Sequence, residues 1–220
     1  NFNCQHAIRS LSGAPRHVRG NFNCCDNELT TLAGAPQSVG GRFKCSSNKL
    51  ASLAGAPQSV GSNFECYNNR IVDLSHAPRI INGDFVCFGN DFIDLTGAPR
   101  TINGSFVSYG CHNLASLAGS PSTVVGGFNC AGSNRLTTLA GAPRDVGGDF
   151  NCSYSRNLTS LAGAPRRVGG DGRVLAPAAI GDHVVAGAEP RIVAVDHLGH
   201  RRARHQRANG WARGEVTRAQ

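Results

Sequence analysis

Apolar residues recur along this chain in a unit of about 21 residues that is repeated eight times. Aligned on its phenylalanine, the unit reads F-x-C-x-x-N-x-L-x-x-L-x-G-A-P-x-x-V-G-G. The anchor residues of the eight units are Phe2, Phe22, Phe43, Phe64, Phe85, Phe106, Phe128 and Phe150. A fixed period of this length is typical of a solenoid, in which each unit packs only against its neighbours. The pattern therefore predicts one long, thin eight-unit array over residues 1–170.

Each unit predicts a short strand, a turn and an extended return segment. In x-F-x-C-x the apolar residues alternate with others, so Phe and Cys face one side of a strand. Stacked units would form a parallel sheet with strands about 4.8 Å apart. The Asn of the unit then turns the chain and satisfies backbone groups through its amide. The residues in this place are Asn27, Asn48, Asn69, Asn90 and Asn134. Gly-Ala-Pro ends any helix, so we expect extended or 3₁₀-like segments on the convex side.

The unit resembles the leucine-rich repeat, whose pattern is L-x-x-L-x-L-x-x-N/C-x-L. In the third unit, the fourth, sixth, ninth and eleventh places of the leucine-rich pattern are occupied by Phe43, Cys45, Asn48 and Leu50. More narrowly, the unit is similar to the short F-x-C-S-x-N-x-L-T-S-L-x-G-A-P repeats of uncharacterised bacteriophage and bacterial proteins. The resemblance implies a β-rich solenoid, a leucine-rich-repeat-like right-handed coil with a parallel concave sheet and a mostly non-helical convex side. That group is defined by its repeat, so the resemblance implies no particular reaction.

Most of the nine cysteines form a column, since each follows its anchor phenylalanine by two residues. The members are Cys4, Cys24, Cys45, Cys66, Cys87, Cys130 and Cys152. A zinc site needs ligands that converge, whereas these recur once per turn. Their Cβ atoms would lie about 4.8 Å apart, further than the roughly 3.8 Å of a disulfide. We therefore expect reduced core thiols and a reducing compartment, the cytoplasm of the cell or of a host cell. Cys25 and Cys111 fall outside the column and are candidates for exposed thiols.

Composition and charge narrow the class of protein only slightly. The net charge is +8, from 22 basic and 14 acidic residues. No apolar run approaches the roughly 18 residues that suggest a membrane span, so we expect no membrane association. The chain opens on a repeat strand and contains no methionine, which predicts a fragment or a start inside a longer gene.

After residue 170 the F-x-C pattern stops. Short β-like stretches at 183–186 and 191–195 predict a degenerate cap over residues 171–196, or the start of another module. The segment 197–220 holds six arginines against the single Glu215 and few large apolar residues, so we expect a basic, disordered tail.

Side chains that flank Phe and Cys line the open face of the predicted sheet, where solenoids present their ligand sites. Most of them are small and polar. The exceptions lie in three central units. One column there is formed by Tyr67, Phe88 and Tyr109, and beside it lie Val86 and Val107. Exposed aromatic clusters with a polar rim mark partner sites, which makes these residues candidates for partner binding. The alternative is that these cross-strand aromatics only stabilise the sheet.

A second column follows the prolines and is rich in arginine. We regard this column as a candidate anion-binding edge. Its members are Arg79, Arg100, Arg144 and Arg166, together with Arg16 in the first unit. Regularly spaced arginines can follow phosphates or an acidic partner. The alternative is a solvated edge whose like charges discourage association between sheets. No aromatic residues are interleaved with this column, which weakens a single-stranded nucleic-acid interpretation.

Enzyme chemistry finds little support in the sequence. None of the eight histidines repeats in register with a carboxylate or nucleophile, and no G-x-S-x-G, P-loop or H-E-x-x-H pattern occurs. We expect no catalytic residues, no cofactor and no metal site.

The sequence predicts a protein-interaction scaffold that binds an unidentified protein partner on the concave sheet. One alternative is a nucleic-acid-associated protein that uses the arginine edge and the basic tail. Another is a non-catalytic structural component of a phage or virion. We expect a monomer, with end-to-end association as a further option.

Overall fold

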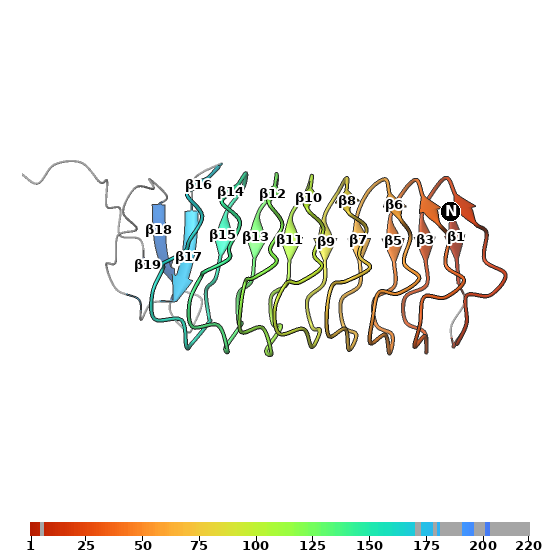
Figure 1. Cartoon of the computed structure of the whole chain (residues 1–220), viewed down its shortest axis with the longest axis horizontal. Helices are drawn as coiled ribbons and strands as arrows, with labels where there is room; N and C mark the ends of the chain where they lie inside the picture. Colours follow the sequence, from red (N-terminus) through yellow and green to blue (C-terminus); the bar gives the residue numbers. More distant parts are fainter. Residues whose placement is uncertain (5–6, 170–172, 178–179, 181–190, 196–200, 203–220) are drawn as a thin grey trace, which may run out of the picture.

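The chain winds as a β-solenoid of about eight turns (Figure 1). The computed structural model describes residues 1–4, 7–169, 173–177, 180, 191–195 and 201–202. These ranges contain no α-helix. Each repeat contributes two short strands, one at the anchor phenylalanine and one at the valine or isoleucine before the Gly-rich corner. The predicted β-rich solenoid with parallel stacking is confirmed.

Two parallel sheets run along the whole array. The strands of the anchor phenylalanines belong to an eleven-stranded sheet, which we call the phenylalanine sheet. Its strands are β1 (Phe2–Asn3), β3 (Phe22–Asn23), β5 (Phe43–Lys44), β7 (Phe64–Glu65), β9 (Phe85–Val86), β11 (Phe106–Val107), β13 (Phe128–Asn129), β15 (Phe150–Asn151), β17 (Arg173–Pro177), β18 (Arg191–Val195) and β19 (Arg201–Arg202). The eight-stranded valine sheet comprises β2 (His17–Val18), β4 (Ser38–Val39), β6 (Ser59–Val60), β8 (Ile80–Ile81), β10 (Thr101–Ile102), β12 (Thr123–Val124), β14 (Asp145–Val146) and β16 (Arg167–Val168).

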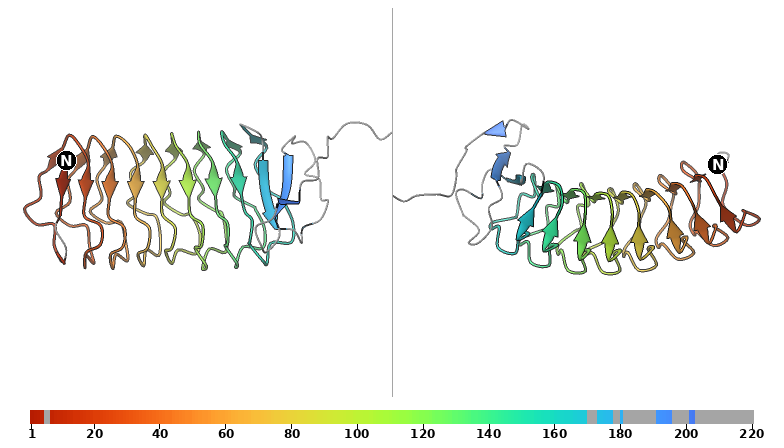
Figure 2. Two further views of the ribbon diagram at one scale, coloured as in Figure 1. Left: turned by 180° about the vertical axis from the view of Figure 1, so that it is seen from behind. Right: turned by 90° about the horizontal axis from the view of Figure 1, so that it is seen from above.

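Neighbouring turns lie in register, because the repeat places the same type of residue at the same height in each turn. Phe22 pairs with Phe43, and Val39 with Val60. Among the described strands, only β18 and β19 pair in the antiparallel direction. The array follows a gentle arc with the phenylalanine sheet on its inner side (Figure 2). The valine sheet was not predicted, since only an extended or 3₁₀-like segment was expected there.

Columns of like side chains fill the space between the sheets. The anchor rings from Phe22 to Phe150 are fully buried, and neighbouring ring centroids in this column lie 4.8–5.7 Å apart. The two leucines of each unit, such as Leu50 and Leu53, and valines such as Val60 complete the core. All nine cysteines are free, and six of the predicted column are fully buried while Cys4 is partly buried. Burial of each phenylalanine contributes about 1.5–3 kcal/mol, so stacking in register stabilises the whole array.

The predicted asparagine turn is confirmed in the four units of 21 residues. Asn69 Nδ2 donates to the carbonyl oxygens of Cys66 and Tyr67 in its own turn and of Cys45 in the previous turn. Its Oδ1 accepts a hydrogen bond from the Leu50 N–H of the previous turn. Asn48 and Asn90 repeat this pattern, and Asn27 repeats most of it. Each amide therefore joins two turns through groups that are buried from water.

The last three units have one extra residue between the cysteine place and the first leucine, and this changes the turn. The asparagine place is filled there by Cys111, Ser133 and Ser155. Ser133 Oγ donates to the Cys130 carbonyl oxygen at 2.8 Å, as an asparagine amide does elsewhere. The prediction for Asn134 is therefore wrong, because it lies one residue beyond this place and is only partly buried.

The prediction that Cys111 is exposed is also wrong. Its side chain is fully buried, and its Sγ lies 3.7 Å from the Cys87 carbonyl oxygen, the contact that an asparagine would make. The cysteine column is filled at this turn by the buried Ser108 instead. Cys25 is partly buried rather than fully exposed.

Beyond the eighth repeat, β17 and β18 extend the phenylalanine sheet. Val174 pairs with Phe150 and is buried in its place, and Ala176 is buried in the place of the next cysteine. The sheet thus continues for at least one turn after the F-x-C pattern has ended. Most of 171–196 and of 197–220 lies outside the described residues, so the cap or module and the basic tail stay predictions.

Candidate functional site

Three aromatic side chains stack on the solvent side of the phenylalanine sheet, just after strands β7, β9 and β11. The ring centroids of Tyr67 and Phe88 lie 4.5 Å apart with planes at 7°, and those of Phe88 and Tyr109 lie 4.4 Å apart at 15°. Tyr109 is 42% exposed, and the other two rings are partly buried. The structure thus brings together the column that the sequence predicted. We call these three residues, with Val86 and Val107, the apolar patch.

The rings of the patch lie closer together than the rings of the core, where the centroids are 4.8–5.7 Å apart. This follows from the arc, since side chains on the inner side of a curved sheet converge. Each ring covers the faces of its neighbours, so solvent reaches mainly the ring edges. At the two ends of the stack the next turns carry the small residues Ser46, which is fully buried, and Ala131.

The two valines of the patch interrupt a row that is polar in the other repeats. Val86 pairs in register with Val107 on the next turn. On one side the row continues with Glu65, whose carboxylate lies 3.2 Å from Lys44 Nζ. On the other side it continues with Asn129. The patch therefore has a polar rim at both ends, as partner-binding surfaces commonly do.

A further polar column, absent from the sequence analysis, lies at the corner between the two sheets. The residue before the anchor phenylalanine accepts a hydrogen bond from the backbone N–H one turn later. Asn63 Oδ1 accepts from Asp84 at 3.0 Å, Asp84 Oδ1 from Ser105 at 2.8 Å, and Ser105 Oγ from Gly127 at 3.1 Å. The recurrence of Asn, Asp and Ser before Phe was the available signal for this column.

The corner column stops at Gly127, which has no side chain to continue it. A hollow of about 280 Å³ lies here, beside Val107 of the patch. Among the described residues, no side chain accepts the Asp149 N–H, although its counterparts one and two turns earlier have such an acceptor. Asn129 and Asn151 also line the hollow. It therefore combines amide groups with an apolar wall and with Asp149, whose carboxylate pairs with Arg173 at 2.8 Å.

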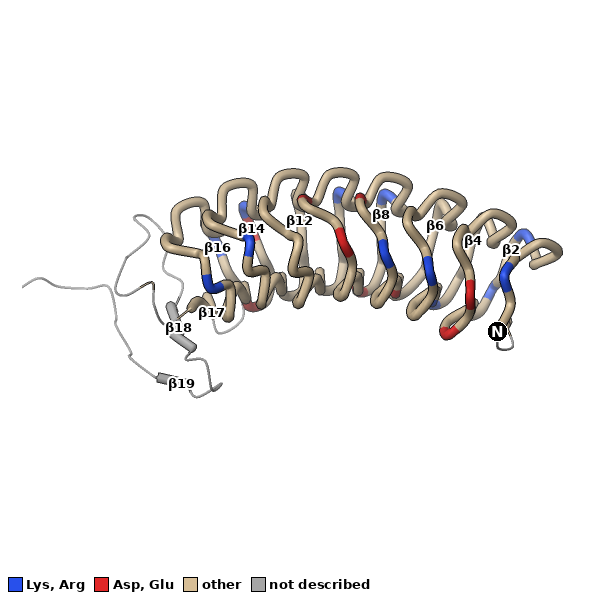
Figure 3. The backbone as a smooth tube through the Cα atoms, turned by 90° about the horizontal axis from the view of Figure 1, so that it is seen from below, with Lys and Arg blue, Asp and Glu red and all other residues tan. Residues whose placement is uncertain are grey.

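The predicted arginine edge lies along the valine sheet. Each of its four arginines is exposed and directly precedes a strand: Arg79 precedes β8, Arg100 precedes β10, Arg144 precedes β14 and Arg166 precedes β16. None of these four forms an ion pair within the part of the chain that the structure describes. Figure 3 shows basic residues spread along the whole array with acidic residues among them. The structure confirms the column but does not test its binding role.

Among the described strands of the valine sheet, the one acidic residue is Asp145, and it is paired. Asp145 accepts hydrogen bonds from Arg167 at 2.7 and 2.8 Å. These hydrogen bonds hold the pKa of the Asp145 carboxyl below its usual value. The valine sheet therefore carries its acidic group near the C-terminal end of the array, away from the first turns.

The buried thiols are unsuited to nucleophilic or metal chemistry. Burial raises the pKa of Cys111 to about 11 and that of Cys152 to about 12, so both stay protonated at neutral pH. The thiolate is the nucleophile and the metal ligand, and these side chains do not form it. Within the described ranges, no group of three or more His, Cys, Asp or Glu residues could hold a metal ion.

Comparisons of the chain with protein-family models, with curated protein sequences and with solved structures found no match. The assignment of the chain as a repeat-based β-solenoid with a period of about 21 residues therefore rests on its sequence and structure alone. Within the described part of the chain, no helix is long and apolar enough to cross a membrane.

Proposed function

We propose that this protein is a non-enzymatic interaction scaffold that binds a protein partner on the inner face of the phenylalanine sheet. The observation that carries the proposal is the apolar patch on a face that is otherwise small and polar. Aromatic side chains that become buried dominate the energetics of protein interfaces. The stack holds its three rings in place before a partner arrives, so binding costs little side-chain entropy.

The remainder of the sheet supplies the rim of this interface. A stable interface buries about 800 Å² on each partner, which is more than five side chains provide. The partner therefore extends along neighbouring turns, over Lys44 and Glu65 on one side and Asn129 and Asn151 on the other. Their charges and amides fix its orientation. The hollow at Gly127 receives one of its polar side chains.

The test compares two variants of the full chain that each replace apolar side chains by serine, within the patch or outside it. The patch variant carries Tyr67→Ser, Phe88→Ser and Tyr109→Ser. The control carries Val72→Ser and Ile93→Ser, since these side chains are 55% and 59% exposed outside the patch in turns that also carry patch residues. Immobilised proteins are used to capture partners from a cell lysate, and circular dichroism verifies the fold. We expect the patch variant to lose partners that the control retains. Equal capture by a folded patch variant would contradict the proposal.

We further infer that the unit is a short variant of the leucine-rich repeat, with Phe and Cys in two places usually held by leucine. The in-register parallel stacking and the inner position of the phenylalanine sheet support this relation. The free, buried thiols support a reducing compartment such as the cytoplasm of the cell or of a host cell.

A further inference from the structure

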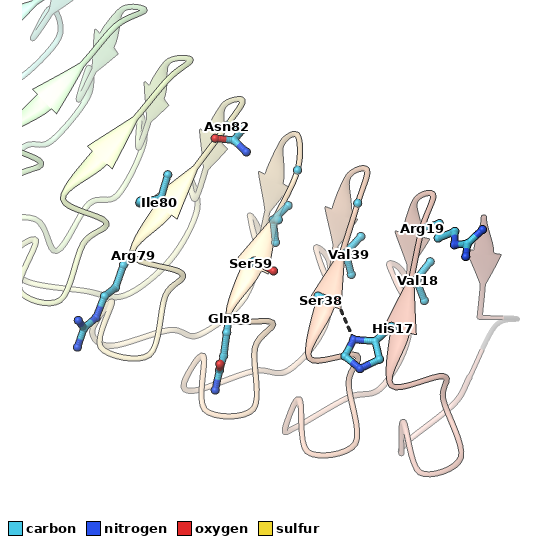
Figure 4. A pocket seen from close by; sticks show the side chains of 13 residues that line it. His17, Val18, Arg19, Ser38, Val39, Gln58, Ser59, Arg79, Ile80 and Asn82 are labelled. Carbon is cyan, nitrogen blue, oxygen red and sulfur yellow. Dashed lines mark hydrogen bonds between the residues drawn. The ribbon is translucent and has the colours of Figure 1, made fainter.

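A shallow groove of about 590 Å³ crosses the valine sheet over the first four turns. Its middle lies over β4 and β6, where Ser38, Ser59 and the following Gly40 and Gly61 carry small side chains or none. Larger side chains stand at its two ends, among them Arg79 (Figure 4). The depression therefore arises where small residues coincide on two adjacent turns.

The groove is positively charged and contains no opposing charge. None of the thirteen residues that line it is a carboxylate. Arg19 and Arg79 lie at opposite ends of it (Figure 4), and neither forms an ion pair within the described residues. Both guanidinium groups are therefore available to an anion that enters from solvent.

Neutral hydrogen-bond donors line the groove in its third and fourth turns. Ser59 contributes a hydroxyl and Gln58 a side-chain amide, and both residues are exposed. Asn103 donates to Asn82 Oδ1 at 3.2 Å, which leaves the Asn82 Nδ2 as a donor. Cations with several neutral donors and no carboxylate make a surface suited to oxyanions.

The length of the groove selects an extended ligand. Arg19 follows β2 and Arg79 precedes β8, so the two are three turns apart, about 14 Å at about 4.8 Å per turn, and also three positions apart along the strands, about 10 Å at about 3.3 Å per residue. One phosphate group is too short to reach both guanidinium groups, whereas a linear chain of phosphates along the array can contact both and the neutral donors. His17 is the one aromatic side chain among the residues that line the groove, so the groove offers nucleic-acid bases little stacking surface.

We propose that this groove binds a bare linear chain of phosphate groups, of the inorganic polyphosphate class. The site lies on the valine sheet and is independent of the apolar patch. Polyphosphate binding and partner binding can therefore fail or succeed separately.

The first experiment titrates the full chain with long-chain inorganic polyphosphate by calorimetry. The arginines within 197–220 also attract polyanions, so the comparison uses Arg79→Gln against Arg166→Gln, an equal charge change in the same column outside the groove. We expect Arg79→Gln to weaken binding by about three- to tenfold and Arg166→Gln by less than about twofold. In nuclear magnetic resonance spectra, polyphosphate should shift the backbone amide signals of Gln58 and Ser59.

A second pair of variants tests the middle of the groove. Ser59→Glu places a carboxylate between the two arginines, while Thr123→Glu places one at the same exposed position of β12. We expect Ser59→Glu to weaken polyphosphate binding by more than about tenfold and Thr123→Glu to have little effect. Pyrophosphate, which spans only one end, should bind at least about tenfold more weakly than the long chain.

Three results would overturn the proposal. Absence of polyphosphate binding at low salt would show that the groove is not a polyphosphate site. Equal effects of Arg79→Gln and Arg166→Gln, or of the two glutamate variants, would show only general attraction to a basic protein. A single-stranded oligonucleotide of equal charge that binds as tightly, with the same loss in Arg79→Gln, would assign the groove to nucleic acid instead.

Discussion

Replacing Asn69 by alanine should destabilise the array, because this side chain joins two turns in the interior. Its Nδ2 donates to the carbonyl oxygens of Cys45, Cys66 and Tyr67 at 3.1, 3.1 and 3.3 Å. Its Oδ1 accepts from the Leu50 N–H at 3.1 Å. Asn69 is only 8% exposed, so water has little access to the groups that alanine would leave without a partner.

The size of the expected loss in stability depends on which backbone groups keep another hydrogen-bond partner after Asn69 is replaced. The Cys45 carbonyl oxygen retains Asn48 Nδ2 at 3.1 Å, and the Cys66 carbonyl oxygen retains Asn90 Nδ2 at 3.0 Å. The Leu50 N–H retains no acceptor from this column. An orphaned buried donor costs about 1–3 kcal/mol, and each other lost hydrogen bond about 0.5–1.5 kcal/mol. Since these terms do not add fully, we expect Asn69→Ala to lower the free energy of unfolding by about 2–4 kcal/mol.

The assay is urea unfolding followed by circular dichroism, with amide hydrogen exchange at Leu50 because repeat arrays can open locally. Asn103→Ala is the matched control, since it removes one exposed hydrogen bond and should change stability by less than about 0.5 kcal/mol. Asn69→Ser copies the natural Ser133 and should lose less than alanine does. A loss for Asn69→Ala no larger than that of the control would refute the role assigned to the asparagine column.

Three further predictions concern the patch, the corner and the thiols. Phe88→Ala should lower the free energy of unfolding in urea by about 1–3 kcal/mol, because it removes two stacked contacts of about 0.5–1.5 kcal/mol each; no loss would mean that the rings do not stabilise each other. Gly127→Ser should slow the hydrogen exchange of the Asp149 amide, because the new hydroxyl can accept that N–H while its Cβ lies 3.1 Å from the Asp149 carbonyl oxygen; unchanged exchange would count against the explanation. Stability should fall as pH rises above about 8.5, since the unfolded chain loses thiol protons there while burial raises the pKa of Cys111 to about 11 and of Cys152 to about 12. Urea titrations between pH 7 and 10 test this, and a flat profile would exclude it.

Residues that occupy the same place in every unit could be located from the sequence. Phe43 and Cys45 alternate with their neighbours, and only in-register stacking buries both in every turn. The same logic placed Tyr67, Phe88 and Tyr109 in one column, because a position in the repeat fixes a position in the stack. Asn69 could be assigned to the turn for the same reason.

Residues outside the common spacing could not be located in this way. Cys111 follows Phe106 by five residues, as Asn69 follows Phe64, so it occupies the asparagine place. It was expected to be exposed only because it lies outside the F-x-C spacing. Asn134 was misplaced because it lies two residues before Leu136, as Asn48 lies before Leu50, while the extra residue puts it six residues after Phe128. The valine sheet was missed because two residues per turn are too few to show an alternating pattern.

The repeat pattern by itself determined the solenoid, its period and its buried columns, since these depend on the spacing of residues along one chain. Only the tertiary structure decided the hollow at Gly127 and the groove across β4 and β6. These features depend on curvature and on the relative size of side chains in neighbouring turns. That information appears only when turns 20 to 22 residues apart are placed side by side.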